Sequence, residues 1–172
     1  MMTVRLRIAA MLVGHALFGR RAAPVPRTRL ALRCWPTDCD INLHMNNSRY
    51  LALMDLGRWH YLLATGLATA VWRRRWAPVA VRAEIDFKRS LRPGERFELE
   101  TFAIAASARS VTIAQRFWRG DTLCADARIV VLFMHAGKPQ ALAPLFEEVP
   151  TGAPLPEPAS GEPAPCEPAQ VA

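Results

Sequence analysis

Apolar and polar side chains alternate along much of the chain. Residues 79–88 keep a strict two-residue period, which is typical of a strand with one buried face. Turn sequences such as Arg92-Pro93-Gly94-Glu95 separate these alternating runs. Strands of this length joined by short turns predict an antiparallel meander, which one separate strand precedes. The predicted strands are residues 30–35, 79–88, 97–101, 111–117 and 125–134.

The stretch from about Ser48 to Thr65 has a helical period instead. Its main apolar side chains fall on one side, few positions are charged, and Gly66 supplies a C-terminal stop, so we expect a long helix that is buried on most sides. Residues 67–78 form either a short helix or a loop. The order of one strand, one long helix and four antiparallel strands predicts an α+β fold. In this fold a curved antiparallel sheet wraps around the helix and buries both apolar faces.

The two ends of the chain differ from its middle. Residues 1–26 form an apolar, amphipathic segment with arginines near both ends, and its apolar run is well short of the about twenty residues that a spanning helix needs. We expect residues 4–21 either to lie on a membrane surface or to pack on the domain. A signal peptide is a further alternative, although its cleavage site is unconvincing. Residues 27–149 are the predicted domain, and the Pro-, Ala- and Glu-rich tail 150–172 is expected to be disordered.

The length and net charge of the chain limit the kinds of ligand and partner that we expect. The chain has 172 residues, which suits one domain with a real core, and its net charge of +7 comes mostly from arginine. Such a charge favours phosphate-bearing ligands or an anionic membrane; no nucleic-acid-binding motif is present, so we expect no nucleic-acid partner. We expect a cytoplasmic protein, and peripheral contact with the inner membrane face is left open.

The cysteines indicate neither a metal site nor a disulfide framework. All four stand singly, without the paired Cys/His spacing of a zinc site, and a reducing compartment fits them best. We therefore expect no metal and no cofactor. Cys39 is interpreted as a small space-filling side chain rather than a nucleophile. The four are Cys34, Cys39, Cys124 and Cys166.

Polar side chains concentrate between the first strand and the long helix, where residues 38–50 read Asp-Cys-Asp-Ile-Asn-Leu-His-Met-Asn-Asn-Ser-Arg-Tyr. Asp, Asn and Ser favour turns and helix N-caps, so this stretch predicts a strand-to-helix loop with Asn46 or Asn47 as the N-cap. Loop formation and capping account for Asp38 as well. They do not require an acid, an amide and an imidazole at alternate positions, so Asp40, Asn42 and His44 are candidate catalytic residues.

The pattern Asp-x-Asp-x-Asn-x-His-x-Asn-Asn-x-x-Tyr, followed by Asp55 and Arg58, resembles the hot-dog-fold acyl thioesterases. Its Asp-x-Asn-x-His part is similar to plant acyl-carrier-protein thioesterases, and residues 43–51 resemble the thioesterase-like THEM6 group. The resemblance covers about residues 30–136. It implies a hot-dog fold and a role in lipid metabolism as a hydrolase of acyl-CoA or acyl-carrier-protein thioesters. Open sheet edges and the resemblance together predict a homodimer or homotetramer.

The resemblance also implies roles for the candidate residues. Asp40 would attack the thioester or deprotonate a water, Asn42 would position the water, and His44 would orient it or act as the base. Free amides at the start of the helix would form an oxyanion hole. Tyr50 and Asp55 are alternatively a core residue and half of a helix ion pair, and basic residues after the second strand would bind phosphate. The expected substrate contacts are Asn46, Asn47, Tyr50, Asp55, Lys88 and Arg89.

Two other functions remain open on the sequence. Hot-dog enoyl-thioester hydratases or dehydratases also place Asp and His in a loop, with the pattern Asp-x-Asn-Pro-x-His. Here one residue fewer lies between Asn42 and His44, the proline is missing, and Asn-Asn-x-x-Tyr follows, which favours hydrolysis. A non-catalytic acyl-binding protein at the membrane periphery is the second alternative, and the intact Asp40, Asn42 and His44 argue against it.

Overall fold

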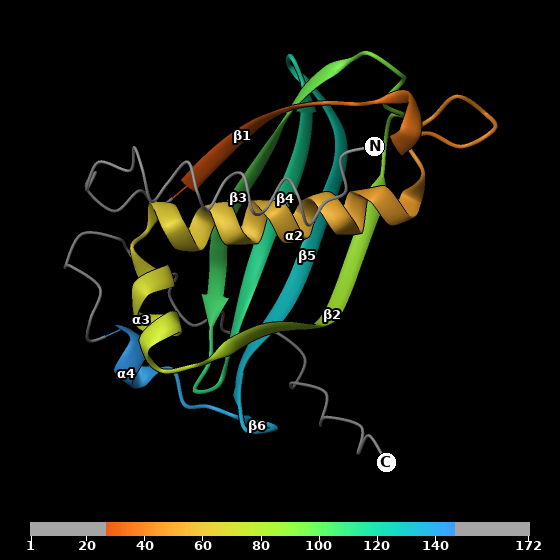
Figure 1. The fold of residues 1–172 in the computed structure, drawn as a ribbon. Helices are drawn as coiled ribbons and strands as arrows, with labels where there is room; N and C mark the ends of the chain where they lie inside the picture. The colour runs from red at the N-terminus through yellow and green to blue at the C-terminus, as the bar shows by residue number, and fades with distance from the viewer. Residues whose placement is uncertain (1–26, 147–172) are drawn as a thin grey trace.

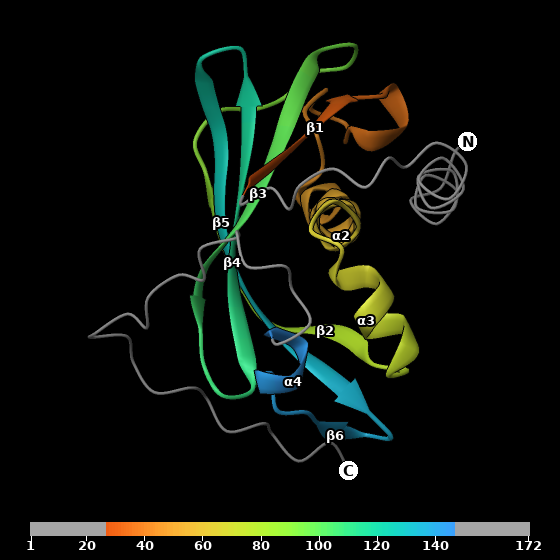
Figure 2. The same ribbon diagram turned by 90° about the vertical axis from the view of Figure 1, so that its left-hand side faces the viewer.

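The computed structural model describes residues 27–146, so the predictions for residues 1–26 and for the tail lie outside the described residues. A curved antiparallel sheet carries one long helix on its concave face (Figure 1). In the view of Figure 2 this helix is seen nearly end-on, with the sheet along one side of it. The predicted α+β fold is confirmed.

The sheet is built from five long strands and one short one. They are β1 (Arg27–Arg33), β2 (Ala77–Phe87), β3 (Arg96–Ala106), β4 (Ser110–Arg119), β5 (Thr122–His135) and β6 (Lys138–Pro139). The helices are α2 (Asn47–Ala64), α3 (Leu67–Arg73) and α4 (Ala143–Phe146). Neighbouring strands follow the order β1-β3-β4-β5-β2, and β6 pairs with β5. Residues 67–73 are thus a short helix, one of the two predicted alternatives.

The prediction that β2 joins the meander as a hairpin with β3 is wrong, because β2 pairs with β5 at the far side of the sheet. A turn does form at residues 92–95, where Glu95 N–H donates to the Arg92 carbonyl at 3.2 Å. It belongs to a longer connection, residues 88–95, that crosses the end of the sheet. Leu91 in this connection is fully buried and so ties it to the core. A turn sequence fixes the local bend and not the strand that the chain then joins.

The long helix lies unusually close to the sheet at Gly57. A Cβ atom there would come within 2.7 Å of Leu99 Cδ2 and 2.8 Å of Gln115 Nε2. Gln115 Nε2 also donates to the Met54 carbonyl at 2.9 Å and to Thr101 Oγ1 at 3.1 Å, so a buried amide joins the helix to β3 and β4. The absence of a side chain at Gly57 therefore allows α2 to pack this closely against the sheet.

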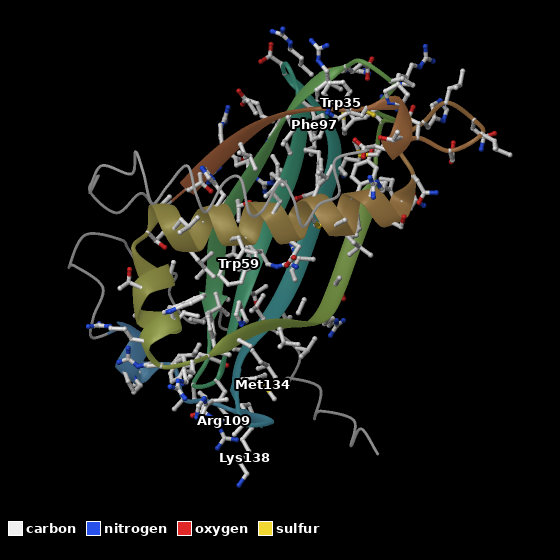
Figure 3. All side chains as sticks on the ribbon, in the orientation of Figure 1. Trp35, Trp59, Phe97, Arg109, Met134 and Lys138 are labelled. Carbon is white, nitrogen blue, oxygen red and sulfur yellow. The ribbon has the colours of Figure 1, made fainter. Side chains whose placement is uncertain are left out.

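The two ends of the molecule carry different elements. The loop from β1 to α2 lies at one end, whereas α3, α4 and β6 lie at the other (Figures 1 and 2). Figure 3 shows Trp35 at the loop end, Trp59 beside α2, and Arg109 and Lys138 reaching outward at the opposite end. Within residues 27–146, no helix has the length and apolarity needed to cross a membrane.

Candidate active site

The segment between β1 and α2 has two parts. Residues Trp35–Asp38, which we call the anchored turn, form one turn of 3-10 helix closed by Asp38 N–H to the Trp35 carbonyl at 2.8 Å. Residues Cys39–Met45, which we call the Asp40 hairpin, fold back so that Cys39 and Met45 form an isolated antiparallel bridge. The Met45 N–H then donates to the Leu91 carbonyl at 2.8 Å, which joins the hairpin to the crossing connection.

The carboxylate of Asp38 holds the anchored turn in place. It is 1% exposed, and its Oδ1 accepts hydrogen bonds from Arg49 Nε at 3.1 Å and Nη2 at 2.8 Å. Its Oδ2 accepts the Trp35 N–H at 3.1 Å, and its main-chain carbonyl accepts the Asn46 N–H at 2.9 Å. A buried carboxylate needs such partners, so Asp38 is a positioning residue that joins β1, the loop and α2.

The hairpin brings Asp40, Asn42 and His44 into one tight turn. Asp40 Oδ1 accepts the Asn42 N–H at 2.9 Å, and the Asp40 N–H donates to the His44 carbonyl at 2.9 Å. Asp40 and His44 therefore face each other across the hairpin and are both partly exposed. Within residues 27–146, the second carboxylate oxygen of Asp40 accepts no hydrogen bond, so it is available to a ligand or water.

The tip of the hairpin is apolar and exposed. Ile41 is 97% exposed and Leu43 is 66% exposed. Leu43 also has a φ of 56°, in the left-handed region that a branched side chain rarely adopts. Backbone strain of this kind costs roughly 1–3 kcal/mol and persists only where the surroundings enforce it. The hairpin is thus held in a strained form at the residue between Asn42 and His44.

Asn46 caps α2, which is one of the two predicted alternatives. Its Oδ1 accepts the Ser48 N–H at 2.9 Å and the Ser48 hydroxyl at 2.7 Å, and its carbonyl accepts the Arg49 N–H at 2.8 Å. In the described part of the chain the Asn47 N–H has no acceptor. One amide at the positive end of the helix dipole therefore remains for an anionic oxygen, three residues beyond His44.

Tyr50 lies in the core rather than on the surface of the site. Its ring packs edge-on against Phe87 at a centroid distance of 5.0 Å and Phe117 at 4.8 Å. Burial raises the pKa of Tyr50 to about 12, although hydrogen bonding with the Leu91 backbone acts to lower it. The neutral phenol therefore fixes the first turn of α2 against the sheet, and direct contact of Tyr50 with substrate stays a prediction.

Asp55 pairs with Arg58 on the same helix, as the three-residue spacing suggests. Arg58 Nη2 donates to Asp55 Oδ1 at 3.0 Å, and Nη1 donates to Gln115 Oε1 at 3.2 Å. Burial lowers the pKa of Arg58, and the Asp55 carboxylate acts in the opposite direction. The Asp55–Arg58 pair thus adds a second hydrogen bond between α2 and Gln115 of β4. A contact of Asp55 with substrate stays a prediction.

Lys88 and Arg89 lie where β2 ends, at the same end of the molecule as the Asp40 hairpin. Both main-chain N–H groups donate to the Cys124 carbonyl, at 2.8 Å and 3.0 Å. Both side chains are exposed, and within residues 27–146 neither forms an ion pair with a carboxylate. Two cations are therefore accessible at the start of the connection that binds Met45.

Sequence reasoning missed two contacts of the loop. The partner of Asp38 is Arg49, which lies eleven positions later on α2, so no local spacing rule indicates it. The sequence pattern indicates single cysteines, yet the Sγ atoms of Cys34 and Cys39 lie 3.4 Å apart. The only signal in the sequence was their spacing of five around a proline-containing turn. Within the described residues, no group of three or more His, Cys, Asp and Glu residues gathers to hold a metal ion.

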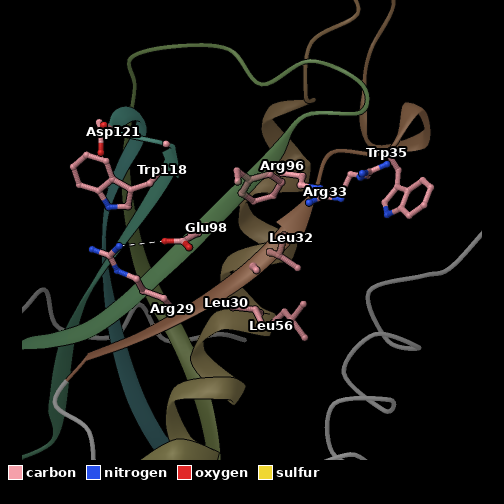
Figure 4. Close-up of a pocket in the computed structure, with 13 residues that line it drawn as sticks. Arg29, Leu30, Leu32, Arg33, Trp35, Leu56, Arg96, Glu98, Trp118 and Asp121 are labelled. Carbon is pink, nitrogen blue, oxygen red and sulfur yellow. Dashed lines mark hydrogen bonds and ion pairs between the residues drawn. The ribbon is translucent and has the colours of Figure 1, made fainter.

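A cleft of about 950 Å³ lies on the β1 side of the sheet and not at the Asp40 hairpin (Figure 4). Leu30, Leu32 and Leu56 line one part of it, and charged groups that include the Arg29–Glu98 pair line another. Asp40, Asn42 and His44 do not line this cleft. Cleft geometry alone would therefore direct attention away from the candidate catalytic residues.

The fold and the loop define a class of protein. One long helix on a curved antiparallel sheet of order β1-β3-β4-β5-β2 is the hot-dog fold, and solved thioesterases share it. The probable thioesterase from Bartonella henselae is similar with a TM-score of 0.63 and 22% identity, over 67% of this chain and 98% of that chain. Slr0204, a 1,4-dihydroxy-2-naphthoyl-CoA thioesterase from Synechocystis, is similar with a TM-score of 0.61 and 16% identity, over 70% of this chain and 93% of that chain.

Sequence comparison identifies the family. Residues 34–159 match the Thioesterase-like superfamily, and the chain belongs to it. Among curated relatives, Protein THEM6 of Xenopus laevis is 35% identical over 82 residues, which are 48% of this chain and 40% of that protein. The match thus spans less than half the length of this relative. The predicted membership in the hot-dog thioesterase superfamily is confirmed.

Proposed function

We propose that the protein hydrolyses acyl thioesters and that the Asp40 hairpin carries the chemistry. The observation that supports this most is the uncommitted oxygen of Asp40, which lies seven residues before the uncommitted N–H of Asn47 in the same loop-to-helix segment. Hydrolysis needs an attacking oxygen and a donor for the negative charge that develops on the carbonyl oxygen. One short segment supplies both groups.

In the reaction, Asp40 either attacks the thioester carbonyl carbon or removes a proton from the water that attacks it. The carbonyl oxygen becomes negatively charged in the tetrahedral intermediate, where the Asn47 N–H and the helix dipole stabilise it. The C–S bond then breaks, and the thiolate leaves and takes up a proton. After direct attack by Asp40, water hydrolyses the mixed anhydride that this step leaves on Asp40, which releases the acid and restores the carboxylate. His44 orients the water or shares the proton transfer, and Asn42 positions the water. The Asx turn from Asp40 to the Asn42 N–H keeps these groups in register.

We further propose that the substrate is an acyl-CoA rather than an acyl-carrier-protein thioester. Coenzyme A carries phosphates, and Lys88 and Arg89 are two accessible cations at the start of the connection that binds Met45. The activity named for the Synechocystis structure, on 1,4-dihydroxy-2-naphthoyl-CoA, agrees with a coenzyme A carrier. The acyl group remains open.

The proposed assembly is a homodimer formed along β2, with the homotetramer as the alternative. β2 is an outer strand, and in the described sheet only β5 pairs with it. An open edge that also displays apolar side chains favours pairing with another strand. The large apolar side chains exposed on β2 are Val79, Val81 and Phe87.

The proposed location is the cytoplasm, with residues 4–21 in contact with a membrane surface. The support is in the sequence: an apolar run with Arg5 and Arg7 before it and Arg20 and Arg21 after it suits an anionic lipid surface. Sedimentation with anionic and with neutral vesicles tests it, since the contact requires more protein to sediment with the anionic ones.

The test of the function is a paired assay on purified full-length protein. One preparation receives a series of saturated acyl-CoA chain lengths, their trans-2-enoyl counterparts, and acyl-carrier-protein thioesters. We expect free coenzyme A from the saturated substrates, which a hydratase cannot produce because it needs a double bond beside the carbonyl. Water addition to the enoyl substrates without thiol release would instead identify a hydratase. No reaction with any of these substrates would leave the acyl-binding protein as the better function.

A further inference from the structure

Two thiols meet at the base of the Asp40 hairpin. Cys34 directly follows β1, Cys39 begins the hairpin, and the anchored turn between them brings their Sγ atoms to 3.4 Å. The Cys39 thiol also donates to the Trp35 carbonyl at 3.6 Å, which leaves the Cys34 thiol as the donor between the sulfurs. Both cysteines are free thiols in this arrangement.

The two cysteines differ in accessibility and in their contacts with the core. Cys34 is 0% exposed, its N–H donates to the Glu95 carbonyl at 2.9 Å, and its carbonyl accepts the Gly94 N–H at 2.7 Å. Burial, reinforced by the neighbouring Cys39 sulfur, raises the pKa of Cys34 to about 12, so Cys34 keeps its proton. Cys39 is only partly buried and lies in the loop. A soluble oxidant therefore reaches Cys39 first.

We propose that Cys34 and Cys39 form a reversible disulfide in response to hydroperoxide. This bond displaces the Asp40 hairpin and so inhibits hydrolysis. The Cys39 thiolate attacks one peroxide oxygen, the O–O bond breaks, and the products are Cys39 sulfenic acid and hydroxide, which takes up the proton that the thiol lost to form water. Cys34 sulfur then attacks the sulfenic sulfur. The S–O bond breaks, the Cys34 proton leaves with the hydroxyl group as water, and peroxide has been reduced by two electrons.

The bond would move the residue that carries the chemistry. A disulfide has an S–S length of about 2.05 Å, so the two sulfur atoms must come more than an ångström closer than they now lie. Cys34 is held by the core, so Cys39 moves. Asp40 is the next residue, and the bridge from Cys39 to Met45 transmits the shift to the other side of the hairpin. A misplacement of about 1 Å costs on the order of 100-fold in rate.

The sequence makes the disulfide easy to detect. No lysine or arginine lies between Arg33 and Arg49, so trypsin releases both cysteines in one peptide, residues 34–49. Reduced full-length protein is treated with hydrogen peroxide, alkylated and digested. We expect this peptide to lose the mass of two hydrogen atoms and to escape alkylation, and dithiothreitol to reverse both changes. Alkylation of both cysteines, a Cys39 sulfinic acid, or a bond from either one to Cys166 would overturn the proposal.

Two variants and one control separate the switch from general oxidative damage. Cys39→Ser removes the sulfur that peroxide attacks and should abolish the loss of hydrolysis on peroxide treatment. Cys34→Ala removes the sulfur that closes the bond, so Cys39 should stop at sulfenic acid or oxidise further, and the peptide should not lose two hydrogen atoms. Cys124→Ser should leave the effect of peroxide on hydrolysis and on the peptide mass unchanged, because Cys124 is buried and its thiol donates to the Thr122 carbonyl. Loss of the peroxide effect in Cys124→Ser, or its persistence in Cys39→Ser, would contradict the assignment.

The effect on hydrolysis rests on the proposed function, whereas the disulfide does not. Free coenzyme A is separated by chromatography, because thiol reagents would react with the protein and the reductant. We expect hydrolysis to fall by about tenfold to a hundredfold on oxidation and to recover in dithiothreitol. Equal rates in the disulfide and dithiol forms would overturn the switch. A wild type with no activity in either state would remove the proposed function, and the peptide mass would still confirm or refute the disulfide.

Discussion

The anchored turn and the Asp40 hairpin are neighbours in the chain and opposites in packing. In the anchored turn, the Asp38 carboxylate is buried and both its oxygens are bonded, by Arg49 and by the Trp35 N–H. In the hairpin, Asp40 is partly exposed and one of its oxygens bonds only the Asn42 N–H. Asp38 and Asp40 are separated by one residue and carry the same carboxylate, yet their surroundings differ. One positions the loop, and the other is available to a substrate.

The two outer strands of the sheet show the same contrast. On β1, Arg29 pairs with Glu98 at 3.2 Å and with Glu100 at 3.1 Å. Charged side chains on that edge disfavour pairing with another strand. On β2 the corresponding edge displays apolar side chains, which include Val79 and Val81. Paired charges mark an edge that remains in solvent, and exposed apolar groups favour an edge that another strand covers.

The largest effect on stability is expected when the anchored turn loses its cation. Arg49→Met leaves the buried Asp38 carboxylate without its main partner, and breaking a buried pair in this way costs about 3 kcal/mol of unfolding free energy. Urea denaturation measures the change. Arg33→Met is the matched control, since Arg33 is exposed, and it should change stability by less than about 0.5 kcal/mol. Equal losses in the two variants would remove the contrast between the turn and the hairpin.

Charge on β2 should separate the subunits. Val81→Lys places a like charge on both copies of a strand that pairs across a dimer, so light scattering at micromolar concentration should show a shift toward monomer. Ala31→Lys puts the same charge on the exposed face of β1, opposite Glu98, and should leave the assembly unchanged. A wild type that is already a monomer with full activity would contradict the dimer along β2.

A methyl group at Gly57 tests the close contact that sets the depth of α2. Gly57→Ala brings the new Cβ within 2.7 Å of Leu99 and displaces the amide of Gln115, and overpacking of this kind costs about 1–3 kcal/mol. Thermal unfolding should show a lower Tm. Gly66→Ala is a poor control, because φ at Gly66 is 78° and an alanine would be strained there. Ala64→Gly, at the end of the same helix, is the control used instead. A stabilised Gly57→Ala would mean that the helix has room to move away.

The smallest effect is expected at the junction of the hairpin and the helix. Asn46→Ala removes the cap that accepts from Ser48, which costs about 1 kcal/mol. Asn47→Ala keeps the backbone amide and removes only an exposed side chain, so its unfolding free energy should change by less than about 0.5 kcal/mol. Chemical denaturation of both variants measures the difference. A larger loss of unfolding free energy in Asn47→Ala than in Asn46→Ala would show that Asn46 is not the cap.

Local chemistry made part of this structure predictable. The period of residues 48–65 and the glycine after them located α2, and the polar side chains of residues 38–50 predicted the strand-to-helix loop and narrowed the cap to Asn46 or Asn47. What could not be predicted depends on long-range packing. The sequence contains no signal that β2 pairs with β5 or that Arg49 bonds Asp38, and only a spacing of five residues indicates that Cys34 lies against Cys39. Each of these contacts is set by how the loop and the crossing connection close over one end of the core.

One experiment compares the two carboxylates directly. Asp38→Asn and Asp40→Asn are both nearly isosteric, and each is measured for Tm and for release of coenzyme A from a saturated acyl-CoA. We predict that Asp40→Asn keeps the wild-type Tm, because its amide oxygen still accepts the Asn42 N–H, and loses about a hundredfold to ten-thousandfold in kcat/KM. Asp38→Asn should lower the Tm and retain most of the activity well below that temperature. Unimpaired hydrolysis in a folded Asp40→Asn variant would contradict the assignment of the chemistry to the Asp40 hairpin.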